Sequence, residues 1–396
     1  MEDLYELNGL IYTEERFSRY RPGGYHPVCL GDTFKNGRYK VHHKLGFGSF
    51  ATVWLANDRK QNRWVSLKIL TAESSSESRE LRILDQLAKR SQGNLFSKYI
   101  VQVLDHFVHQ GPNGHHLCIV FELLGPSAAM LLDPLYHSSD DELLETETIF
   151  RVTKQLLKAV RFIHDAGIVH GDISIGNIVF TWSDLSNLSE EEIMEALGPP
   201  DIEPLVRRDG KSLDKGLPRY LVQRADWREW LDEDEEDIRL IDFGEAFLLT
   251  EKPEWVSEPG GMRAPEMIFG EGFDLTGDLW CAGVAIYSLL YVAPPPYFYL
   301  GSKSALLYQM IGLAEDRLPD EWYVKWERMR IEEKRKIFNM ELLEQWKLDP
   351  SFERKVKDPA LRSTLSPILE VIKGLAKFVP SHRMMACEAL KLLEDC

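Results

Sequence analysis

The sequence lacks a long hydrophobic run and contains only five cysteines in 396 residues. Its longest apolar stretch, residues 281–293, is too short to cross a bilayer, and its N-terminal segment is acidic and polar, unlike a secretory signal. The cysteines form no CxxC pair and no Cys/His metal spacing, which argues against a disulfide framework and against a zinc site. We therefore expect a protein of the cytoplasm, the nucleus or both.

An excess of basic residues is also absent. The chain has 63 Asp and Glu against 47 Lys and Arg, a net charge of −16 that repels polyanions and attracts cationic partners. The excess is local, because residues 181–237 carry 17 acidic and 7 basic side chains, a net −10 that leaves −6 for the other 339 residues. We expect no direct binding to nucleic acid and no binding to membranes.

The hydrophobic pattern divides the chain into a sheet-forming part and a helical part. Short β-branched and aromatic runs predict antiparallel strands at residues 38–45, 51–58, 63–70, 99–109 and 115–124. A helix is predicted at residues 75–90, and helices dominate after residue 125. Residues 185–237 break this order with acidic runs and a Gly-Pro-Pro sequence, which predicts an inserted, partly disordered spacer with short helices.

A glycine-containing turn joins two predicted strands. Gly46 and Gly48 would let backbone amides approach a polyphosphate without an intervening Cβ, and Phe50 at the tip would shield the phosphates from water. The strand-to-strand context excludes a dinucleotide-binding fingerprint. Alone the turn indicates little, because a hairpin with two glycines is often purely structural.

Lys68 lies in an apolar predicted strand, where an inward-facing charge needs a partner. Glu80 on the following helix would hold the ammonium while it contacts the α- and β-phosphates, and Glu77, one turn earlier, is the alternative partner. Without the motifs further along the chain, a lysine and a glutamate that simply face solvent would explain the same residues.

The loop of residues 168–180 is the most informative stretch. Asp172 would orient a substrate hydroxyl, and Asn177 would bind a magnesium ion through its amide oxygen. His170 suits loop bracing better than catalysis. Asp242, in an Asp-Phe-Gly sequence at the end of a later strand, would supply a second magnesium ligand.

Three downstream residues would support this loop and its surroundings. Arg383 is placed to neutralise a buried Glu266 of an Ala-Pro-Glu sequence. Asp278 begins a strongly apolar helix, where its carboxylate would cap the helix and hold the catalytic loop.

In this order and on these elements, the motifs resemble those of eukaryotic protein kinases over nearly the whole chain. The sequences that narrow the resemblance are GYHPV at 24–28, GD at 31–32, NGRY at 36–39, KLGFGSF at 44–50, TVWL at 52–55 and VFELLG at 120–125. Together they resemble the SR-protein-specific kinases of the CMGC group. That family phosphorylates serines in arginine/serine-rich splicing factors and splits its kinase domain with a long spacer.

The resemblance implies an α+β, bilobal protein kinase fold, with a small antiparallel-sheet N-lobe containing one helix and a larger, mainly helical C-lobe. The implied parts are an N-terminal extension at residues 1–36, the N-lobe at 37–124 and the C-lobe at 125–396, with the acidic insert at 185–237. The implied small molecules are ATP and Mg²⁺.

The resemblance also assigns the residues of the active site. The catalytic residues are Asp172, Lys68 and Glu80, and the metal ligands are Asn177 and Asp242. The nucleotide-binding residues are Leu45, Gly46, Phe47, Gly48, Ser49, Phe50, Val53, Lys68, Phe121, Glu122 and Leu124. Phe121 is the gatekeeper by resemblance, and the backbone of Glu122 and Leu124 would hydrogen-bond adenine.

Four positions depart from the kinase pattern. Ser174 stands where a lysine usually steadies the transferring phosphate, and its loss predicts slow or altered catalysis because transition-state charge is less well stabilised. Pro259 replaces a threonine that braces the catalytic aspartate. Gly171 replaces an arginine that reads a phosphorylated activation segment, which predicts activity without that modification. Ala51 replaces the third glycine of the turn, a tolerable change for a small residue.

Three functions remain open. We favour a monomeric serine/threonine protein kinase that acts on serine in basic, arginine/serine-rich proteins, although Ser302 and Gln309 stand at positions that are acidic in the family's docking groove. A pseudokinase scaffold, or a slow kinase with another substrate, is the alternative that Ser174 and Pro259 motivate. A small-molecule phosphotransferase shares the His-Gly-Asp loop but not the downstream framework. Deletion of residues 185–232 is predicted to leave phosphoryl transfer largely intact.

Overall fold

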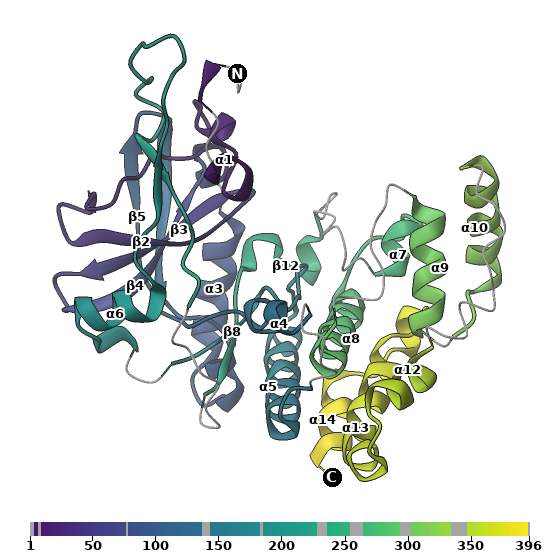
Figure 1. Ribbon diagram of the computed structural model, residues 1–396. Helices are drawn as coiled ribbons and strands as arrows, with labels where there is room; N and C mark the ends of the chain where they lie inside the picture. The colour runs from purple at the N-terminus through teal and green to yellow at the C-terminus, as the bar shows by residue number, and fades with distance from the viewer. Residues whose placement is uncertain are drawn as a thin grey trace. The chain divides into compact units, whose positions relative to one another are not determined.

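The computed structural model describes residues 4–6, 9–76, 78–136, 143–182, 185–227, 236–253, 264–293, 302–314, 316–333 and 347–394. These residues form two compact units (Figure 1). Unit 1 comprises Met1–Leu84, Val101–Pro126 and Thr181–Glu236, and unit 2 comprises Asp85–Ile100, Ser127–Phe180 and Asp237–Cys396. Within the described segments, no helix has both the length and the apolar character needed to cross a membrane.

Unit 1 is organised by a six-stranded sheet in the order β1-β2-β3-β4-β6-β5, in which every neighbouring pair is antiparallel. Its strands are β1 Thr33–Phe34, β2 Tyr39–Gly48, β3 Ala51–Asp58, β4 Arg63–Leu70, β5 Val103–Gly111 and β6 Gly114–Glu122. Side chains alternate across each strand, so Val41, Trp54, Val65 and Cys118 gather on one buried face. Helix α3 (Arg79–Arg90) lies within the predicted helix of residues 75–90, and the short α2 (Ala72–Ser75), which the sequence does not predict, precedes it after β4.

The described part of the insert is folded, whereas the acidic run at 232–237, on which the expected partial disorder also rested, lies mostly outside the described residues. Helix α6 (Glu190–Leu197) begins with a capping box between Ser189 and Glu192, and its acidic first turn suits the positive end of the helix dipole. Strands β9 (Ile202–Pro204) and β10 (Tyr220–Val222) form an antiparallel hairpin. The acidic run Glu190–Glu192 therefore forms the exposed start of a helix whose apolar face is buried.

The insert packs against the N-terminal extension, which contains α1 (Leu10–Thr13). Apolar side chains of the two segments share one core: Tyr5, Leu10, Phe17, Tyr20, Tyr25, Leu205 and Leu221. Isolated backbone bridges join Tyr5 to Arg207 and Lys44 of β2 to Arg224. Residues that the resemblance treats as an interruption of the C-lobe thus belong, by their contacts, with the sheet of unit 1.

Unit 2 is mainly helical, as predicted. Helix α5 (Thr146–Asp165) buries the apolar face that its periodicity indicates. Further helices are α4 Ala128–Tyr136, α7 Pro265–Ile268, α8 Leu275–Tyr291, α9 Lys303–Ala314, α10 Asp320–Glu332, α12 Leu348–Lys355, α13 Pro359–Leu375 and α14 Ala386–Glu394. Two short antiparallel pairs hold the loop of residues 170–177: β7 Ile168–Val169 with β12 Phe247–Leu248, and β8 Ile178–Phe180 with β11 Ile238–Leu240.

Candidate active site

The glycine-containing turn forms the tip of the β2–β3 hairpin in unit 1. Gly48 pairs with Ala51, which leaves Ser49 and Phe50 as a two-residue turn, and Phe50 is 52% exposed. A Cβ built on Gly46 or Gly48 would meet no atom within 4 Å, so the backbone faces open space there. Amides beside such space can donate hydrogen bonds to phosphate oxygens, which is the role predicted for the turn.

The remaining residues expected around this turn lie at the flanks of the hairpin. The strand pairing shifts register between Lys44 and Gly46, so Leu45 is the extra residue of a β-bulge. Leu45 and Val53 are half-buried, whereas Phe47 is exposed.

Lys68 and Glu80 form the ion pair that the sequence suggests. The Lys68 Nζ lies 2.7 Å from Oε1 and 2.8 Å from Oε2 of Glu80. Lys68 on β4 pairs with Val53 on β3, the strand that follows the glycine turn. A charge-assisted contact to both carboxylate oxygens fixes the position of the ammonium. Glu77, the alternative partner, lies outside the described residues.

Phe121, Glu122 and Leu124 lie at the end of strand β6. Phe121 is buried opposite Ser66, and Leu124 follows the strand in irregular backbone. The Glu122 amide donates to the Gln102 carbonyl at 3.2 Å, and the Glu122 carboxylate accepts from the Gln102 amide at 2.9 Å. These reciprocal bonds fix the strand end at which the resemblance expects adenine to bind.

Asp172 and Asn177 meet in the loop between β7 and β8 of unit 2. The Asn177 Nδ2 donates to the Asp172 carboxylate at 3.0 Å and to the Asp172 carbonyl at 2.8 Å. Because the amide nitrogen is used there, Oδ1 is the Asn177 atom that would ligate a cation. The Asn177 carbonyl accepts from the amide of Ile241 at 2.9 Å, which ties the neighbouring Asp242 to the same loop.

The two aspartates create a site of negative charge. Burial, and then the carboxylate of Asp242, raise the pKa of the Asp172 carboxyl to about 7, although the hydrogen bond from Asn177 lowers it. Asp242 has a left-handed backbone with φ 62° and ψ 72°, a conformation that is uncommon outside glycine and often found at functional sites. An amide oxygen and a carboxylate beside this charge fit Mg²⁺, which prefers oxygen ligands and completes its shell with water and phosphate.

His170 braces the loop in the way that the sequence suggests. Its Nδ1 accepts from the Asp172 amide at 3.2 Å, and its Nε2 lies 3.1 Å from the Ile241 carbonyl. Burial lowers the pKa of His170, which favours the neutral ring that these contacts need. The ring also packs edge-on against Phe243, with centroids 4.6 Å apart.

Asp278 holds the same loop from helix α8. Its carboxylate accepts from the amide of His170 at 2.7 Å and from the amide of Gly171 at 3.0 Å. The helix cap expected from Asp278 is wrong, because Asp274 caps α8 by accepting from the Thr276 amide at 2.8 Å. Asp278 lies inside the first turn, where its side chain points to the loop and not to the helix end.

The structure explains why a glycine precedes Asp172. Gly171 has φ +82°, and a Cβ there would lie 3.0 Å from the Glu245 carbonyl oxygen. An arginine at this position would be strained. Ser174, which stands where kinases usually have a lysine, is half-buried. Its carbonyl accepts from the Asn177 amide at 3.0 Å and forms a turn of the loop.

The predicted Glu266–Arg383 pair is present and bidentate. Arg383 Nη1 and Nη2 lie 2.7 and 2.6 Å from the two carboxylate oxygens of Glu266, and both side chains are buried. Arg383 Nη1 also donates to the carbonyl of Thr276 at 2.8 Å. The pair therefore joins α7 to the start of α8 and to the C-terminal segment.

Other positions where the sequence departs from the kinase pattern are Ser302 and Gln309, expected in the docking groove, and Pro259. Ser302 is buried and its hydroxyl donates to the carboxylate of Glu333 at 2.6 Å, so an acidic group stands beside this position although Ser302 is neutral. Gln309 is half-buried on α9. Pro259 lies outside the described residues.

Sequence reasoning missed two side chains that contact the glycine turn. Tyr25 Oη donates to the carbonyl of Gly48 at 2.7 Å, and Lys44, fully buried, lies at the start of the bulge. Lys44 could have been noticed, because it is a charged residue within the alternating pattern of β2. Tyr25 stood in the GYHPV motif, which supported the family resemblance but indicated no role.

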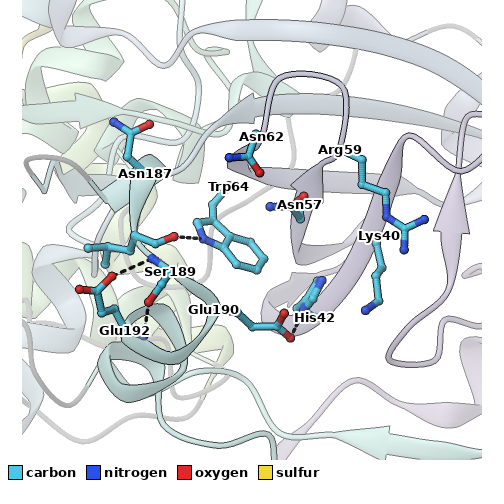
Figure 2. A pocket seen from close by; sticks show the side chains of 11 residues that line it. Lys40, His42, Asn57, Arg59, Asn62, Trp64, Asn187, Ser189, Glu190 and Glu192 are labelled. Atoms are coloured by element: carbon cyan, nitrogen blue, oxygen red, sulfur yellow. Dashed lines mark hydrogen bonds and ion pairs between the residues drawn. The ribbon is translucent and has the colours of Figure 1, made fainter.

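A cavity of about 540 Å³ lies elsewhere in unit 1, between the β2–β4 strands and α6 (Figure 2). It is lined by Lys40, His42, Asn57, Arg59, Asn62, Trp64, Asn187, Leu188, Ser189, Glu190 and Glu192. His42 faces Glu190 at 3.0 Å, and the Trp64 indole donates to the Leu188 carbonyl at 2.7 Å. None of the predicted nucleotide-binding residues lines this cavity. It is a gap between the sheet and the insert, which pack against each other here.

The chain is similar in sequence to known protein kinases. The protein kinase domain family model matches residues 39–188. The chain is 36% identical to protein kinase dsk1 of Schizosaccharomyces pombe over 51% of this chain and 40% of that protein. It is 32% identical to serine/threonine-protein kinase SKY1 of Saccharomyces cerevisiae over 52% and 27%, and 29% identical to serine/threonine-protein kinase SRPK of Physarum polycephalum over 70% and 65%.

A solved structure agrees with these matches at the level of the fold. The crystal structure of the PF14_0431 kinase domain has a TM-score of 0.62 and 19% identity, and the alignment covers 93% of this chain and 97% of that one. The present chain spans less than half the length of dsk1 and of SKY1.

These matches, with the antiparallel sheet of unit 1 and the helices of unit 2, confirm the predicted protein kinase fold. A domain of this class uses ATP with a divalent metal. Within the class, the chain is similar to the serine/threonine-protein kinases SKY1 and SRPK and to protein kinase dsk1.

Proposed function

We propose that this protein is an active serine/threonine kinase that transfers the γ-phosphate of ATP to serines of basic, arginine/serine-rich proteins. The observation that carries the proposal is the loop in which Asn177 orients the Asp172 carboxylate and is tied by its carbonyl to the residue before Asp242. A scaffold without catalysis would not need the Asp172 carboxylate oriented by Asn177 or Asp242 held next to the same loop by a backbone bond.

The chain's own groups account for the steps of transfer. Asp172 accepts a hydrogen bond from the substrate hydroxyl and directs its oxygen for in-line attack, and Asn177 keeps that carboxylate oriented. Lys68, held by Glu80, contacts the α- and β-phosphates. Mg²⁺ on Asn177 Oδ1 and Asp242 would neutralise charge on the phosphates.

The substrate preference rests on charge and on similarity. The net charge of −16 favours a cationic partner, but −10 of it lies in residues 181–237 and supports tethering or regulation by the insert more directly than a substrate groove; one relative carries the name SRPK. Glu333 beside Ser302 adds an acidic group on unit 2, near where the family resemblance expects a docking groove. These observations support a basic protein substrate.

The test is transfer of labelled γ-phosphate from Mg-ATP to an arginine/serine repeat peptide, compared with a basic protein that lacks such repeats. Wild-type protein should label the repeat peptide, and Asp172→Ala should reduce labelling to background. Equal labelling of both substrates would retain the kinase and reject the substrate preference. No labelling above the Asp172→Ala background would reject the kinase.

The pseudokinase scaffold remains the second candidate because Ser174 removes a cation from the catalytic loop. It predicts nucleotide binding without transfer in the wild type and recovery of transfer in Ser174→Lys. The two candidates are thus separated by the same assay.

A further inference from the structure

The N-terminal extension contacts the glycine turn directly. Tyr25 Oη donates to the Gly48 carbonyl at 2.7 Å, and Tyr25 is only 3% exposed. Its ring lies edge-on to Tyr20 with centroids 5.4 Å apart, and the Arg19 guanidinium lies 5.2 Å from its centroid. Burial raises the pKa of Tyr25, so the hydroxyl stays protonated and remains a donor.

This bond sets the direction of a neighbouring amide. The Gly48 carbonyl and the Ser49 N–H belong to one planar trans peptide unit, in which they point in opposite directions. When Tyr25 holds the carbonyl on its side, the Ser49 N–H is directed away from the extension. On the far side of the turn, the Phe50 carbonyl accepts from the Thr71 amide at 2.8 Å. Both carbonyls that flank the tip are therefore held.

The base of the turn is anchored by the same extension. The Lys44 Nζ donates to Glu14 at 2.6 Å and also to Glu15, and it donates to the Val222 carbonyl of the insert at 3.1 Å. Tyr20 Oη donates in turn to Glu15 at 2.5 Å. Lys44 is fully buried, so this end of the turn cannot move without breaking a buried ionic cluster.

A third contact links the extension to the segment that leads toward Glu80. The carbonyls of Gly23 and Gly24 accept from the amides of Glu73 and Ala72, at 2.8 and 3.1 Å. Residues 14–25 thus touch the turn at its base and its tip, and the start of the helical segment that follows β4.

We propose that residues 14–25 form a brace that fixes the phosphate-binding turn before nucleotide arrives, with Tyr25 as its positioning residue. The inference rests on the proposed function, because the turn is assigned to ATP there. The brace acts through the Gly48–Ser49 peptide, whose N–H is one of the amides offered to the phosphates. A turn held in this way loses less freedom when ATP binds, and its affinity is correspondingly higher.

Tyr25→Phe removes the hydroxyl and keeps the ring contacts, so it tests the brace without opening the core. The matched control is Tyr220→Phe, which removes a hydroxyl that accepts from the Leu30 amide at 2.9 Å and does not contact the turn. We expect the KM for ATP to rise about threefold to tenfold in Tyr25→Phe, the effect of one lost hydrogen bond, with kcat within twofold. Tyr220→Phe should leave both constants unchanged.

Two further readouts keep the test independent of phosphate transfer. The affinity for a fluorescent ATP analogue should fall in Tyr25→Phe by the same factor, and hydrogen exchange at Ser49 and Phe50 should become faster in Tyr25→Phe than in Tyr220→Phe. If the wild type transfers no phosphate, these measurements still report on the brace while the proposed function fails. Unchanged analogue affinity and unchanged exchange in Tyr25→Phe would overturn the brace, as would an equal effect of Tyr220→Phe.

Discussion

At the scale of single residues, Ser174 should limit the rate of phosphate transfer. A lysine there would place a cation near the transferring phosphate, and losing one group that stabilises transition-state charge typically costs about 10²- to 10³-fold in kcat. We expect Ser174→Lys to raise kcat by about tenfold or more, with little change in the KM for ATP. Steady-state kinetics with the repeat peptide measure this.

The matched control is Ser174→Ala, which removes the hydroxyl without adding charge. It should leave kcat within about twofold of the wild type. A fall in kcat in Ser174→Ala, with no gain in Ser174→Lys, would show that the serine itself serves the reaction.

The buried Glu266–Arg383 pair should matter for stability. Arg383→Met would leave the Glu266 carboxylate buried without its partner, at a cost of about 3–5 kcal/mol in the free energy of unfolding. Urea denaturation followed by tryptophan fluorescence measures the loss. The double variant Glu266→Gln with Arg383→Met should recover part of it, and no recovery would indicate that the backbone contacts of Arg383 dominate.

At the scale of elements, the insert should be required for a stable unit 1. Deletion of residues 185–226 would expose the extension side chains that share its core, remove the Val222 carbonyl from Lys44 and leave the Trp64 indole without the Leu188 carbonyl. Each large apolar side chain so exposed costs about 1.5–3 kcal/mol. We expect a melting temperature lower by more than 10 °C, or insoluble protein, which differential scanning fluorimetry and solubility measure.

The control for this deletion is a shorter change in the same segment. Residues 209–212 are exposed in the loop between β9 and β10, so their replacement by two glycines should shift the melting temperature by no more than about 2 °C. A full deletion as stable and as active as the wild type would contradict the structure and support the dispensable spacer that the sequence indicates.

The insert also shows where prediction from the sequence fails. The alternation of β2 to β4 and the helical period of α5 show locally which side chains are buried, so these elements were predictable. The motifs also indicated a loop for Asp172 and Asn177 and the end of a strand for Asp242. The folding of residues 185–227 depends instead on Leu205 and Leu221 meeting side chains of the extension. Such long-range contacts leave no local pattern, and composition then favours disorder.

At the scale of the whole molecule, buried histidines should make the fold sensitive to acid. The rings of His26 and His109 lie 4.6 Å apart and those of His26 and His116 5.1 Å apart. Burial, and then the other two histidines, lower the pKa of His26 to about 3, and burial also lowers the pKa of His109 and of His116. The three join the extension to the β5–β6 hairpin as neutral rings.

A lowered pKa means that the unfolded chain binds more protons than the folded one between pH 6.5 and about 3. The stability these rings contribute is therefore complete above pH 6.5 and is lost as the pH falls below it. For His26 alone the loss at pH 5.5 is about 1.4 kcal/mol. Urea denaturation at pH 7.5, 6.5 and 5.5 should show this decline, and His26→Gln should flatten it; an equal slope in the variant would exclude His26 as its source.

The contacts between the extension and the insert can form only after the insert has been synthesised. The Leu10 amide bonds to Glu203, 193 positions later, and Lys44 bonds to Val222, 178 positions later. At ribosomal rates of about 5–20 residues per second, the first segment of the chain waits roughly 10 to 40 s for its partners. During that interval its tyrosines and Phe17 are exposed on an incomplete lobe, which makes nascent chains that have not yet reached about residue 225 clients for chaperones.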